Sequence, residues 1–229
     1  MMSKCSTCPH ANEYAFCNLG TEARRFLESN SVQMEYPRGS VLFREGDNPT
    51  AIYVLCSGKV KVSVSSQEGR TMILRIARAG DVLGLSAALV GGEQETTVEA
   101  LEPVRARVLH LNHLTNMMKD YAEVSLGAAK SMARDYRAAF DEARLIALPS
   151  SPAGRIARLI LDWAEEARKN SSPFVTMSLT HEEVASMAAT TRETVTRTLS
   201  RLRKENVITT RGVALTVLQS STLERMSAC

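Results

Sequence analysis

The 229-residue sequence has no apolar run that approaches the ~20 residues needed to span a membrane. Its first five residues lack the apolar core of a signal peptide. The sequence also lacks a nucleophile elbow, a phosphate-binding Gly-Lys-Thr/Ser loop and a paired-carboxylate motif. We therefore expect a cytoplasmic protein that does not contact a membrane and is not an enzyme.

The net charge of +3 is unevenly distributed along the chain. Residues 1–148 contain 17 Lys and Arg against 17 Asp and Glu, whereas residues 149–229 contain 11 against 8. A basic C-terminal third beside a neutral body indicates that one part contacts a polyanion while the other has a different role. The length and the apolar content of 44% favour two ordinary domains.

Glycines recur every eleven or twelve residues from Gly46 to Gly91, and short β-branched and apolar runs lie between them. Regular turn spacing of this kind predicts an all-β roll, barrel or sandwich. The predicted strands are 51–55, 59–65, 71–77, 97–101 and 104–109.

From about Tyr121 the apolar period changes to three or four residues and continues for roughly seven turns of helix. The apolar positions are Ala129, Met132, Tyr136, Ala139, Ala143 and Ile146. A long helix with one narrow apolar seam usually pairs with a partner, so Met132 and Tyr136 are interpreted as dimer core before any ligand role. Residues 149–152 predict a hinge, and a further helix is expected over 155–167.

Two short helices are predicted near the C-terminus. Thr180 begins a capping box with Glu183, and Thr191 is the expected N-cap of a second helix. Only Ala189 and Thr190 separate the two helices, which is helix-turn-helix spacing. A two-stranded wing is expected over 207–210 and 214–218, with its turn at 211–212.

The second of these helices has two chemically different faces. Val195, Leu199 and Leu202 form an apolar stripe, and the opposite face carries Arg192, Glu193, Thr196, Arg197 and Ser200. An Arg can contact O6 and N7 of guanine, and a Glu can accept from N4 of cytosine. Base reading is therefore predicted for Arg192, Glu193 and Arg197, with Thr196 on the same face, and phosphate contacts for Thr180, Thr191, Thr194 and Arg201. The alternative is a solvated charged face on a structural winged helix.

Three cysteines lie close together near the N-terminus, at Cys5, Cys8 and Cys17. In a reducing compartment, clustered cysteines are read first as metal ligands or redox groups. An iron-sulfur cluster is favoured, because Pro9 follows a pair of cysteines three residues apart; zinc, thiol redox chemistry and no function remain alternatives. A fourth ligand would be Cys56, His10 or a carboxylate, although a strand cysteine such as Cys56 is more often a small buried hydrophobe.

The order of these segments resembles the CRP/FNR family of bacterial transcription regulators over essentially the full chain. Gly80-Asp81-Val82-Leu83-Gly84 and the run from Arg192 to Arg197 carry the resemblance. It implies an α+β fold with an N-terminal jelly-roll-like β-roll sensor, a long dimerisation helix and a C-terminal winged helix-turn-helix. The implied parts are a cysteine segment at 1–20, a sensor domain at 21–120, a dimerisation helix at 121–148 and a DNA-binding domain at 149–229.

The family further implies a homodimer on a palindromic double-stranded DNA operator, with RNA polymerase as a partner. Arg192, Glu193 and Arg197 match the CRP-type reading triplet, which implies a half-site closer to TGTGA than to TTGAT. The ribose and phosphate positions of cyclic-nucleotide-binding relatives fall near Leu85 and within 92–96, where no cation is present. Burying a phosphate there would be costly, so a cyclic nucleotide is not expected.

The N-terminal cysteines look like the cluster segment of FNR, which implies sensing of oxygen, nitric oxide or redox state. Two departures are visible: the spacing from Cys8 to Cys17 is longer than in FNR, and the fourth FNR ligand corresponds to about Arg107. A haem bound by His110 or His113 is an alternative sensor. The competing class of protein is a metal or thiol redox protein with a vestigial DNA-binding domain.

Overall fold

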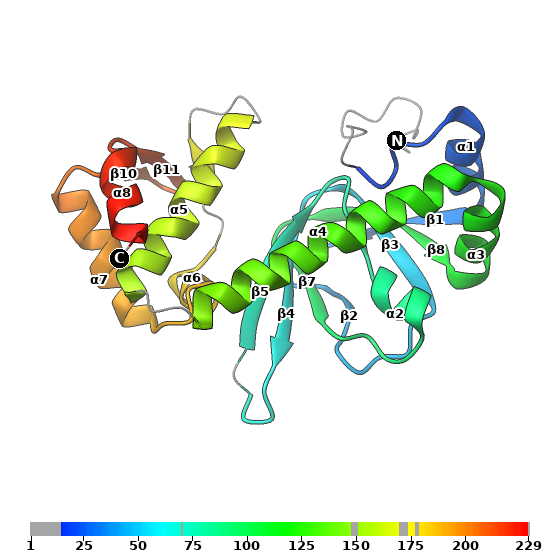
Figure 1. Ribbon diagram of the computed structural model, residues 1–229, viewed down its shortest axis with the longest axis horizontal. Coiled ribbons are helices and arrows are strands. Elements are labelled where there is room, and N and C mark those ends of the chain that lie inside the picture. Colours follow the sequence, from blue (N-terminus) through cyan, green and yellow to red (C-terminus); the bar gives the residue numbers. More distant parts are fainter. Residues whose placement is uncertain (1–14, 70, 148–150, 170–173, 177–178, 229) are drawn as a thin grey trace. The chain divides into compact units, whose positions relative to one another are not determined.

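The computed structural model describes residues 15–69, 71–147, 151–169, 174–176 and 179–228. The chain divides into two compact units, Met1–Phe140 and Asp141–Cys229. Figure 1 shows a strand-rich first unit and a mainly helical second unit. Among the described residues, no helix combines the length and the apolar character needed to cross a bilayer.

The first unit consists mainly of short strands. Helices lie at both ends of its sequence, and one short helix lies between two strands. Its elements are α1 (Thr21–Asn30), β1 (Ser31–Tyr36), β2 (Val41–Phe43), β3 (Ala51–Ser57), β4 (Lys59–Ser65), β5 (Thr71–Arg78), β6 (Val82–Leu83), α2 (Leu85–Val90), β7 (Thr97–Ala100), β8 (Val104–His110), α3 (Leu111–Asp120) and the start of α4 (Ala122–Ala147). The predicted strands and the long helix are present, each within about two residues of its expected ends.

The strands form two four-stranded antiparallel sheets, in the orders β1-β8-β3-β6 and β2-β7-β4-β5. One apolar core lies between the sheets, where Leu55 of β3 and Ala106 of β8 meet Val60 and Val98 of the other sheet. Alternation along the strands turns Ile52, Val54 and Leu109 to the opposite face of the first sheet. The β-roll predicted from the turn spacing is confirmed.

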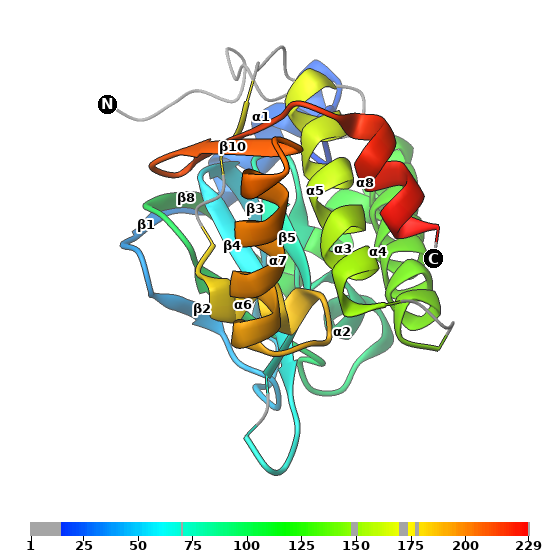
Figure 2. The same ribbon diagram turned by 90° about the vertical axis from the view of Figure 1, so that its left-hand side faces the viewer.

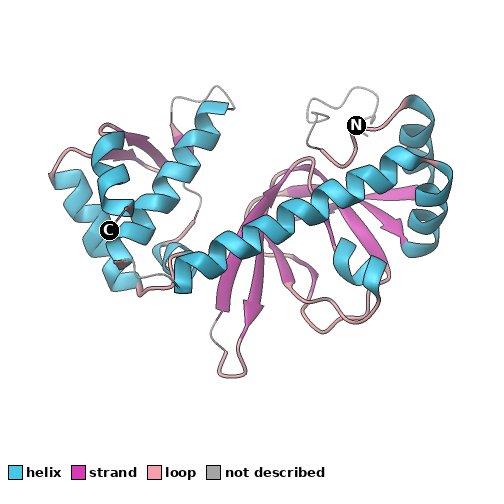
Figure 3. Cartoon of the chain, in the orientation of Figure 1, coloured by secondary structure: helices cyan, strands magenta, loops and turns pink. Residues whose placement is uncertain are grey.

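That outer face of the first sheet is covered by helices (Figure 3). A second core forms there from Ala23 and Leu27 of α1, Leu114 and Met117 of α3, Val124 and Ala128 of α4, and Phe16 and Leu19 of the preceding segment. Neither α1 nor α3 has a side-chain N-cap, so burial of their apolar faces, rather than capping, stabilises them. This second core fixes the start of α4 on the roll.

The second unit is a helix-turn-helix with a wing and two supporting helices. It contains α5 (Pro152–Lys169), β9 (Val175–Thr176), α6 (His181–Met187), α7 (Arg192–Lys204), β10 (Ile208–Arg211), β11 (Ala214–Val217) and α8 (Ser220–Ser227). Its core joins Ile156 and Ile160 of α5 to Leu199 and Leu202 of α7 and Leu223 of α8. Figure 2 shows α8 beside α5, where a Cβ on Gly154 would lie 2.5 Å from the Met226 carbonyl oxygen.

Candidate nucleic-acid interface and cysteine segment

The helix α7 has the two faces that its sequence predicts. Thr191 is the N-cap, and its hydroxyl accepts a hydrogen bond from the Thr194 N–H at 3.3 Å. The buried stripe consists of Val195, Thr198, Leu199 and Leu202. The predicted base readers Arg192, Glu193 and Arg197 are all exposed on the other side, together with Thr196 and Arg201.

The first turn of α7 holds its charged groups in defined positions. The Arg197 guanidinium donates to the Thr194 hydroxyl at 3.3 Å, and the Thr194 and Thr191 hydroxyls are 3.1 Å apart. The pKa of Glu193 is lowered by the hydrogen bond from its own N–H, by the Thr191 hydroxyl, and by the nearby Arg192 and Arg197. Glu193 is therefore an ionised acceptor between two cations, which suits it to a base amino group.

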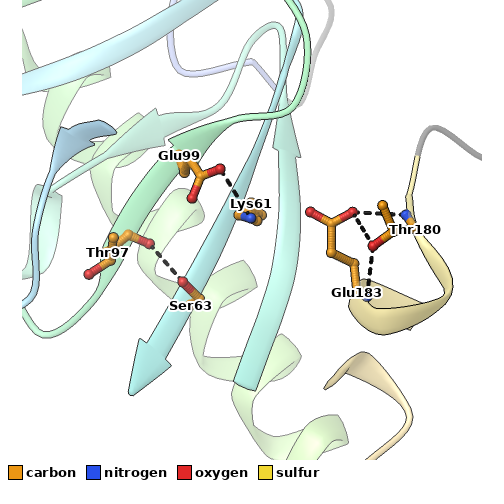
Figure 4. Close-up of polar contacts among 6 residues, drawn as sticks. All are labelled: Lys61, Ser63, Thr97, Glu99, Thr180 and Glu183. Atoms are coloured by element: carbon orange, nitrogen blue, oxygen red, sulfur yellow. Dashed lines mark hydrogen bonds and ion pairs between the residues drawn. The ribbon is translucent and has the colours of Figure 1, made fainter. Parts of the chain in front are cut away.

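The helix α6 begins with the predicted capping box (Figure 4). The Thr180 hydroxyl accepts from the Glu183 N–H at 3.2 Å, while the Glu183 carboxylate accepts from the Thr180 N–H at 2.9 Å. Val184, Met187 and Ala188 are buried as expected. The Thr180 hydroxyl therefore caps α6, and Thr180 is exposed at the N-terminal end of that helix.

The turn between α6 and α7 is held by an arginine that the sequence did not single out. Ala189 adopts a positive φ of 45°, a conformation that favours glycine. Arg155 of α5 donates to the Ala188 carbonyl at 2.7 Å and to the Ala189 carbonyl at 2.9 Å. The guanidinium thereby stabilises a turn in which an alanine has a positive φ.

A second unpredicted contact joins the first residue of α6 to the exposed face of α7. The Nδ1 atom of His181 lies 2.8 Å from the Thr196 hydroxyl, which itself donates to the Arg192 carbonyl at 2.9 Å. The two residues are fifteen positions apart, and no local pattern signals their contact. Only the packing of α6 on α7 brings them together.

The predicted wing is present next to the helix-turn-helix. Antiparallel β10 and β11 are joined by a turn in which Gly212 has a φ of 61°, and the short strand β9 pairs with β11. Thr210 and Thr216 lie on this hairpin. The wing therefore adds two hydroxyl groups to those that α6 and α7 carry in the second unit.

The structure describes two of the four cysteines predicted as ligands. Cys5 and Cys8, together with His10, lie outside the described residues. Cys17 is half-buried and packs against the core on the outer face of the first sheet. Cys56 is half-buried at the end of β3, and its thiol donates to the Val54 carbonyl at 3.7 Å.

Main-chain hydrogen bonds bring the neighbours of Cys17 and Cys56 together. The N–H of Phe16 donates to the Gly80 carbonyl at 2.9 Å, and the Gly80 N–H donates to the Leu55 carbonyl at 2.8 Å. Cys17 and Cys56 each follow one of these bonded residues, so the backbone of the two cysteines lies in the same corner of the first unit. Within the described residues, no three His, Cys, Asp or Glu side chains form a metal-binding group.

Arg107 lies near the position that the resemblance to FNR implies for a fourth ligand. Its side chain is 3% exposed, forms an ion pair with Glu28 at 3.6 Å and donates to the Ser31 hydroxyl at 3.3 Å. A buried guanidinium that binds a carboxylate is a structural group and cannot ligate iron.

The residues at the predicted ribose and phosphate positions include two that are buried and uncharged, Leu85 and Gln94. Leu85, at the predicted ribose position, is 3% exposed and belongs to the apolar core. Gln94, within the predicted phosphate segment, is 4% exposed, and its amide lies about 3.1 Å from where a Cβ on Gly84 would be. A small cavity of about 230 Å³ beside Gln94 is lined by Asp47 and Tyr53, and none of its lining residues is basic.

The first part of α4 presents an exposed apolar seam that differs from the predicted one. Tyr136 is 74% exposed and stacks on Phe140, with ring centroids 6.4 Å apart. Met132, which was expected in the seam, packs instead against the core of its own unit. Five exposed apolar positions follow a heptad: Leu126, Ala129, Ala133, Tyr136 and Phe140. Ala139, another predicted seam residue, is exposed as well.

Ion pairs attach the same helix to the roll. Asp81 bridges Arg75 of β5 and Arg134 of α4, each at 3.6 Å, and Arg75 also pairs with Asp135 at 2.9 Å. Burial raises the pKa of Asp135, while Arg75 opposes that shift. These ion pairs were not predicted, because a charged side chain gives no sequence signal of what it contacts.

Comparisons with known proteins agree with this architecture. A model of the cyclic nucleotide-binding domain matches residues 33–121, and a model of the Crp-like helix-turn-helix domain matches residues 154–226. The CRP-like cAMP-activated global transcriptional regulator of Mycobacterium tuberculosis is 27% identical over 194 residues, which cover 84% of this chain and 86% of that protein. The cAMP-activated global transcriptional regulator CRP of Salmonella typhimurium is 25% identical over 185 residues, covering 80% and 88%.

Solved structures are similar over the same region. A CRP-family transcriptional regulator from Thermus thermophilus superposes with a TM-score of 0.69 at 27% identity, covering 86% of this chain and 97% of that one. FixK2 from Bradyrhizobium japonicum has the same fold, with a TM-score of 0.77 at 19% identity and coverages of 87% and 98%. With its roll, long helix, capped helix α7 and wing, the chain belongs to the CRP/FNR family of DNA-binding transcription regulators, and is not an enzyme.

Proposed function

We propose that this regulator binds a palindromic operator with TGTGA-like half-sites, and that Arg192, Glu193 and Arg197 read the bases. The observation that carries the proposal is the exposure of all three side chains along one face of a capped helix, with Glu193 ionised between two cations. Thr180, Thr191, Thr194 and Arg201 surround this face and are assigned to phosphates. RNA polymerase remains the partner that the family implies.

Fluorescence anisotropy on three duplexes tests this assignment. The duplexes carry two TGTGA half-sites, one such half-site, or none. The proposal predicts the tightest binding to the two-site duplex and a difference of about 1–3 kcal/mol for each mismatched base pair. Equal affinity for all three duplexes at the same salt concentration would refute the operator assignment.

We propose that two copies pair through the apolar seam of α4. Leu126, Tyr136 and Phe140 expose apolar surface in a heptad pattern, and Ala129 and Ala133 between them let two helices approach closely. A two-fold dimer would present two copies of α7 to the two halves of a palindrome. Because the seam would pair two copies of the chain, we expect the two half-sites of one operator to be bound cooperatively.

We propose that the roll does not use a cyclic nucleotide as its signal, although the relatives named above are cAMP-activated. Leu85 offers no hydrogen bond to a ribose, and Gln94 offers no charge to a phosphate. An anion buried beside Asp47 without a cation would be unfavourable. Isothermal titration with cyclic AMP and cyclic GMP tests this: the proposal expects no binding at millimolar nucleotide, and saturable binding would contradict it.

We propose instead that the signal is read by Cys5, Cys8 and Cys17, with Cys56 as the fourth thiolate of an iron-sulfur cluster. Support comes from the common location of Cys17 and Cys56, whose neighbours are linked through Gly80. Four thiolates are the usual ligands of such clusters. When bound, the cluster would supply sensitivity to oxygen, nitric oxide or redox state.

Anaerobic purification followed by visible spectroscopy and iron and sulfide assays tests the sensor. The proposal predicts iron and sulfide that are lost in air, and a lower iron content in Cys17→Ser and Cys56→Ser. The matched control is Cys229→Ser, at the opposite end of the chain, which should keep the iron content of the wild type. Stoichiometric zinc, a sharp Soret band or a protein without metal would each refute the cluster.

A further inference from the structure

Gln94 is a buried polar residue of the roll whose side-chain amide has no hydrogen-bond partner among the described residues. Its main chain, by contrast, is fully bonded. The Gln94 N–H donates to the Asp47 carbonyl at 2.8 Å, and the Gln94 carbonyl accepts from the Gly46 N–H at 2.9 Å. The residue is 4% exposed, yet neither polar atom of the amide is completely enclosed. Because buried amides are normally hydrogen-bonded, water or a ligand must complete this one.

The open space that the amide reaches is a cavity of about 230 Å³. The other polar side chains that line it are those of Asp47, Asn48, Thr50 and Tyr53. Its apolar wall includes Leu42 and the rings of Phe43 and Tyr53, whose centroids lie 5.4 Å apart. The volume is well above the roughly 30 Å³ that one water occupies, so the cavity can hold a small organic molecule.

The charge of this cavity is negative. Among the described lining residues only Asp47 is charged, and its exposure places it at the open side of the cavity. The flanking segments 44–50 and 91–97 contain three further carboxylates and one arginine. Burial raises the pKa of Tyr53 and the charge of Asp47 raises it further, so the carboxylate acts on a neighbouring group of the lining. Such a lining attracts a cation and disfavours an anion.

The lining suits an organic cation better than a metal ion. The cavity offers one carboxylate, and no three His, Cys, Asp or Glu side chains of the described chain gather as metal ligands. The rings of Phe43 and Tyr53 present faces that attract an ammonium group. The Gln94 amide oxygen can accept from an ammonium hydrogen, while Leu42 offers apolar surface to an alkyl chain.

We propose that this cavity is a binding site for a small primary alkylammonium, whose ammonium group donates to the Gln94 amide oxygen and pairs with the Asp47 carboxylate. The proposed function assigns no small molecule to the roll, so this site goes beyond it. It gives the regulator an effector site that does not involve the cysteines. The lack of a basic lining residue, which disfavours a nucleotide, is what an ammonium ligand requires.

Isothermal titration of the full chain with three probes of the same length tests the charge preference. The probes are n-butylammonium, 1-butanol and butyrate, at constant ionic strength. We expect saturable binding of n-butylammonium, at least fivefold weaker binding of 1-butanol and no binding of butyrate. In ¹⁵N NMR spectra of the wild type, n-butylammonium should shift the side-chain amide signals that are missing in Gln94→Met.

Two variants with a matched control locate the site. Gln94→Met keeps the length of the side chain but removes the acceptor, and loss of one hydrogen bond corresponds to about fivefold weaker binding. Asp47→Asn removes the charge but keeps an oxygen for the Arg44 N–H, which Asp47 accepts at 2.7 Å, and should also weaken binding about fivefold. Glu22→Gln removes an exposed carboxylate of α1 outside the lining and should bind as the wild type does.

The charge series on the wild type decides the proposal even if a variant fails to fold, which thermal unfolding reveals. No saturable binding of n-butylammonium would mean that the cavity holds water only, and would overturn the proposal. Equal binding of 1-butanol would overturn the role of the charge. Unchanged affinity in folded Asp47→Asn and Gln94→Met, or Gln94 signals that do not shift, would place the ligand elsewhere and overturn the site. None of these outcomes affects the operator assignment.

Discussion

The carboxylate of Glu123, in the first turn of α4, accepts a hydrogen bond from the N–H of Gly20 at 2.9 Å. Gly20 follows Cys17 by three residues. On the other side of Cys17, Phe16 packs near Gly127 of α4 and donates its N–H to Gly80, next to Asp81, which pairs with Arg134 of α4. The segment that contains Cys17 is thus attached to the proposed dimerisation helix on both sides.

Replacement of Glu123 by Ala should loosen this attachment. The lost hydrogen bond corresponds to about 1 kcal/mol, so the Gly20 amide should exchange with deuterium about fivefold faster. Glu123→Gln keeps an oxygen acceptor and serves as the control. Equal exchange rates in the wild type and Glu123→Ala would show that the contact does not hold the segment.

The turn of the helix-turn-helix should accept glycine at position 189. Ala189 has a φ of 45°, where a Cβ is unfavourable, so Ala189→Gly should stabilise the second unit by about 0.5 to 1 kcal/mol. Urea unfolding followed by circular dichroism measures the change. Ala188→Gly, at a buried residue with a φ of −90°, is the matched control and should destabilise. A loss of stability in Ala189→Gly would contradict the strained turn.

The carboxylate of Glu193 should titrate below its ordinary value of 4.5. Its own N–H, the Thr191 hydroxyl and the flanking arginines favour the charged form, so the pKa is lowered. These interactions contribute stability that is present above the unfolded value and is lost as the pH falls through the folded value. Carbon-detected NMR titration measures the pKa, and Thr191→Val should raise it. An unchanged value in Thr191→Val would exclude the hydroxyl as a cause.

A charge in the apolar seam of α4 should prevent dimerisation. Ala133→Glu would place two carboxylates within the proposed helix pair, so we expect monomers in analytical ultracentrifugation and at least a hundredfold weaker binding to the palindrome. Lys130→Glu, exposed on the same helix outside the seam, is the control and should remain dimeric. A dimeric Ala133→Glu protein would refute the seam.

Much of the fold follows from local patterns in the sequence. Glycine spacing located β4 to the residue, and the threonine N-cap located the start of α7. The helices α1 and α3 were missed, because they lack capping side chains and form by burying apolar residues on a sheet that the sequence does not display. The sequence therefore predicted the strands and helices whose own residues show an apolar period, a turn or a cap.

The site was predictable to the extent that it lies on one helix. Arg192, Glu193 and Arg197 share a face because of helical geometry alone, whereas the contacts of Thr196 with His181, and of Arg155 with the turn, depend on how three helices pack. The seam of α4 shows the same limit, since Met132 fits the apolar period but packs on its own unit. A periodic pattern identifies apolar positions without identifying what covers them.

Base reading by α7 is tested most directly by comparing Arg192→Ala with Arg201→Ala on the palindromic operator and on operators with one guanine substituted. We predict that Arg192→Ala loses about 1–3 kcal/mol on the intact operator and no longer discriminates at one guanine. Arg201→Ala should weaken binding to all the duplexes alike and flatten the dependence on salt. If both variants bind every duplex as the wild type does, α7 does not read this DNA and the account is wrong.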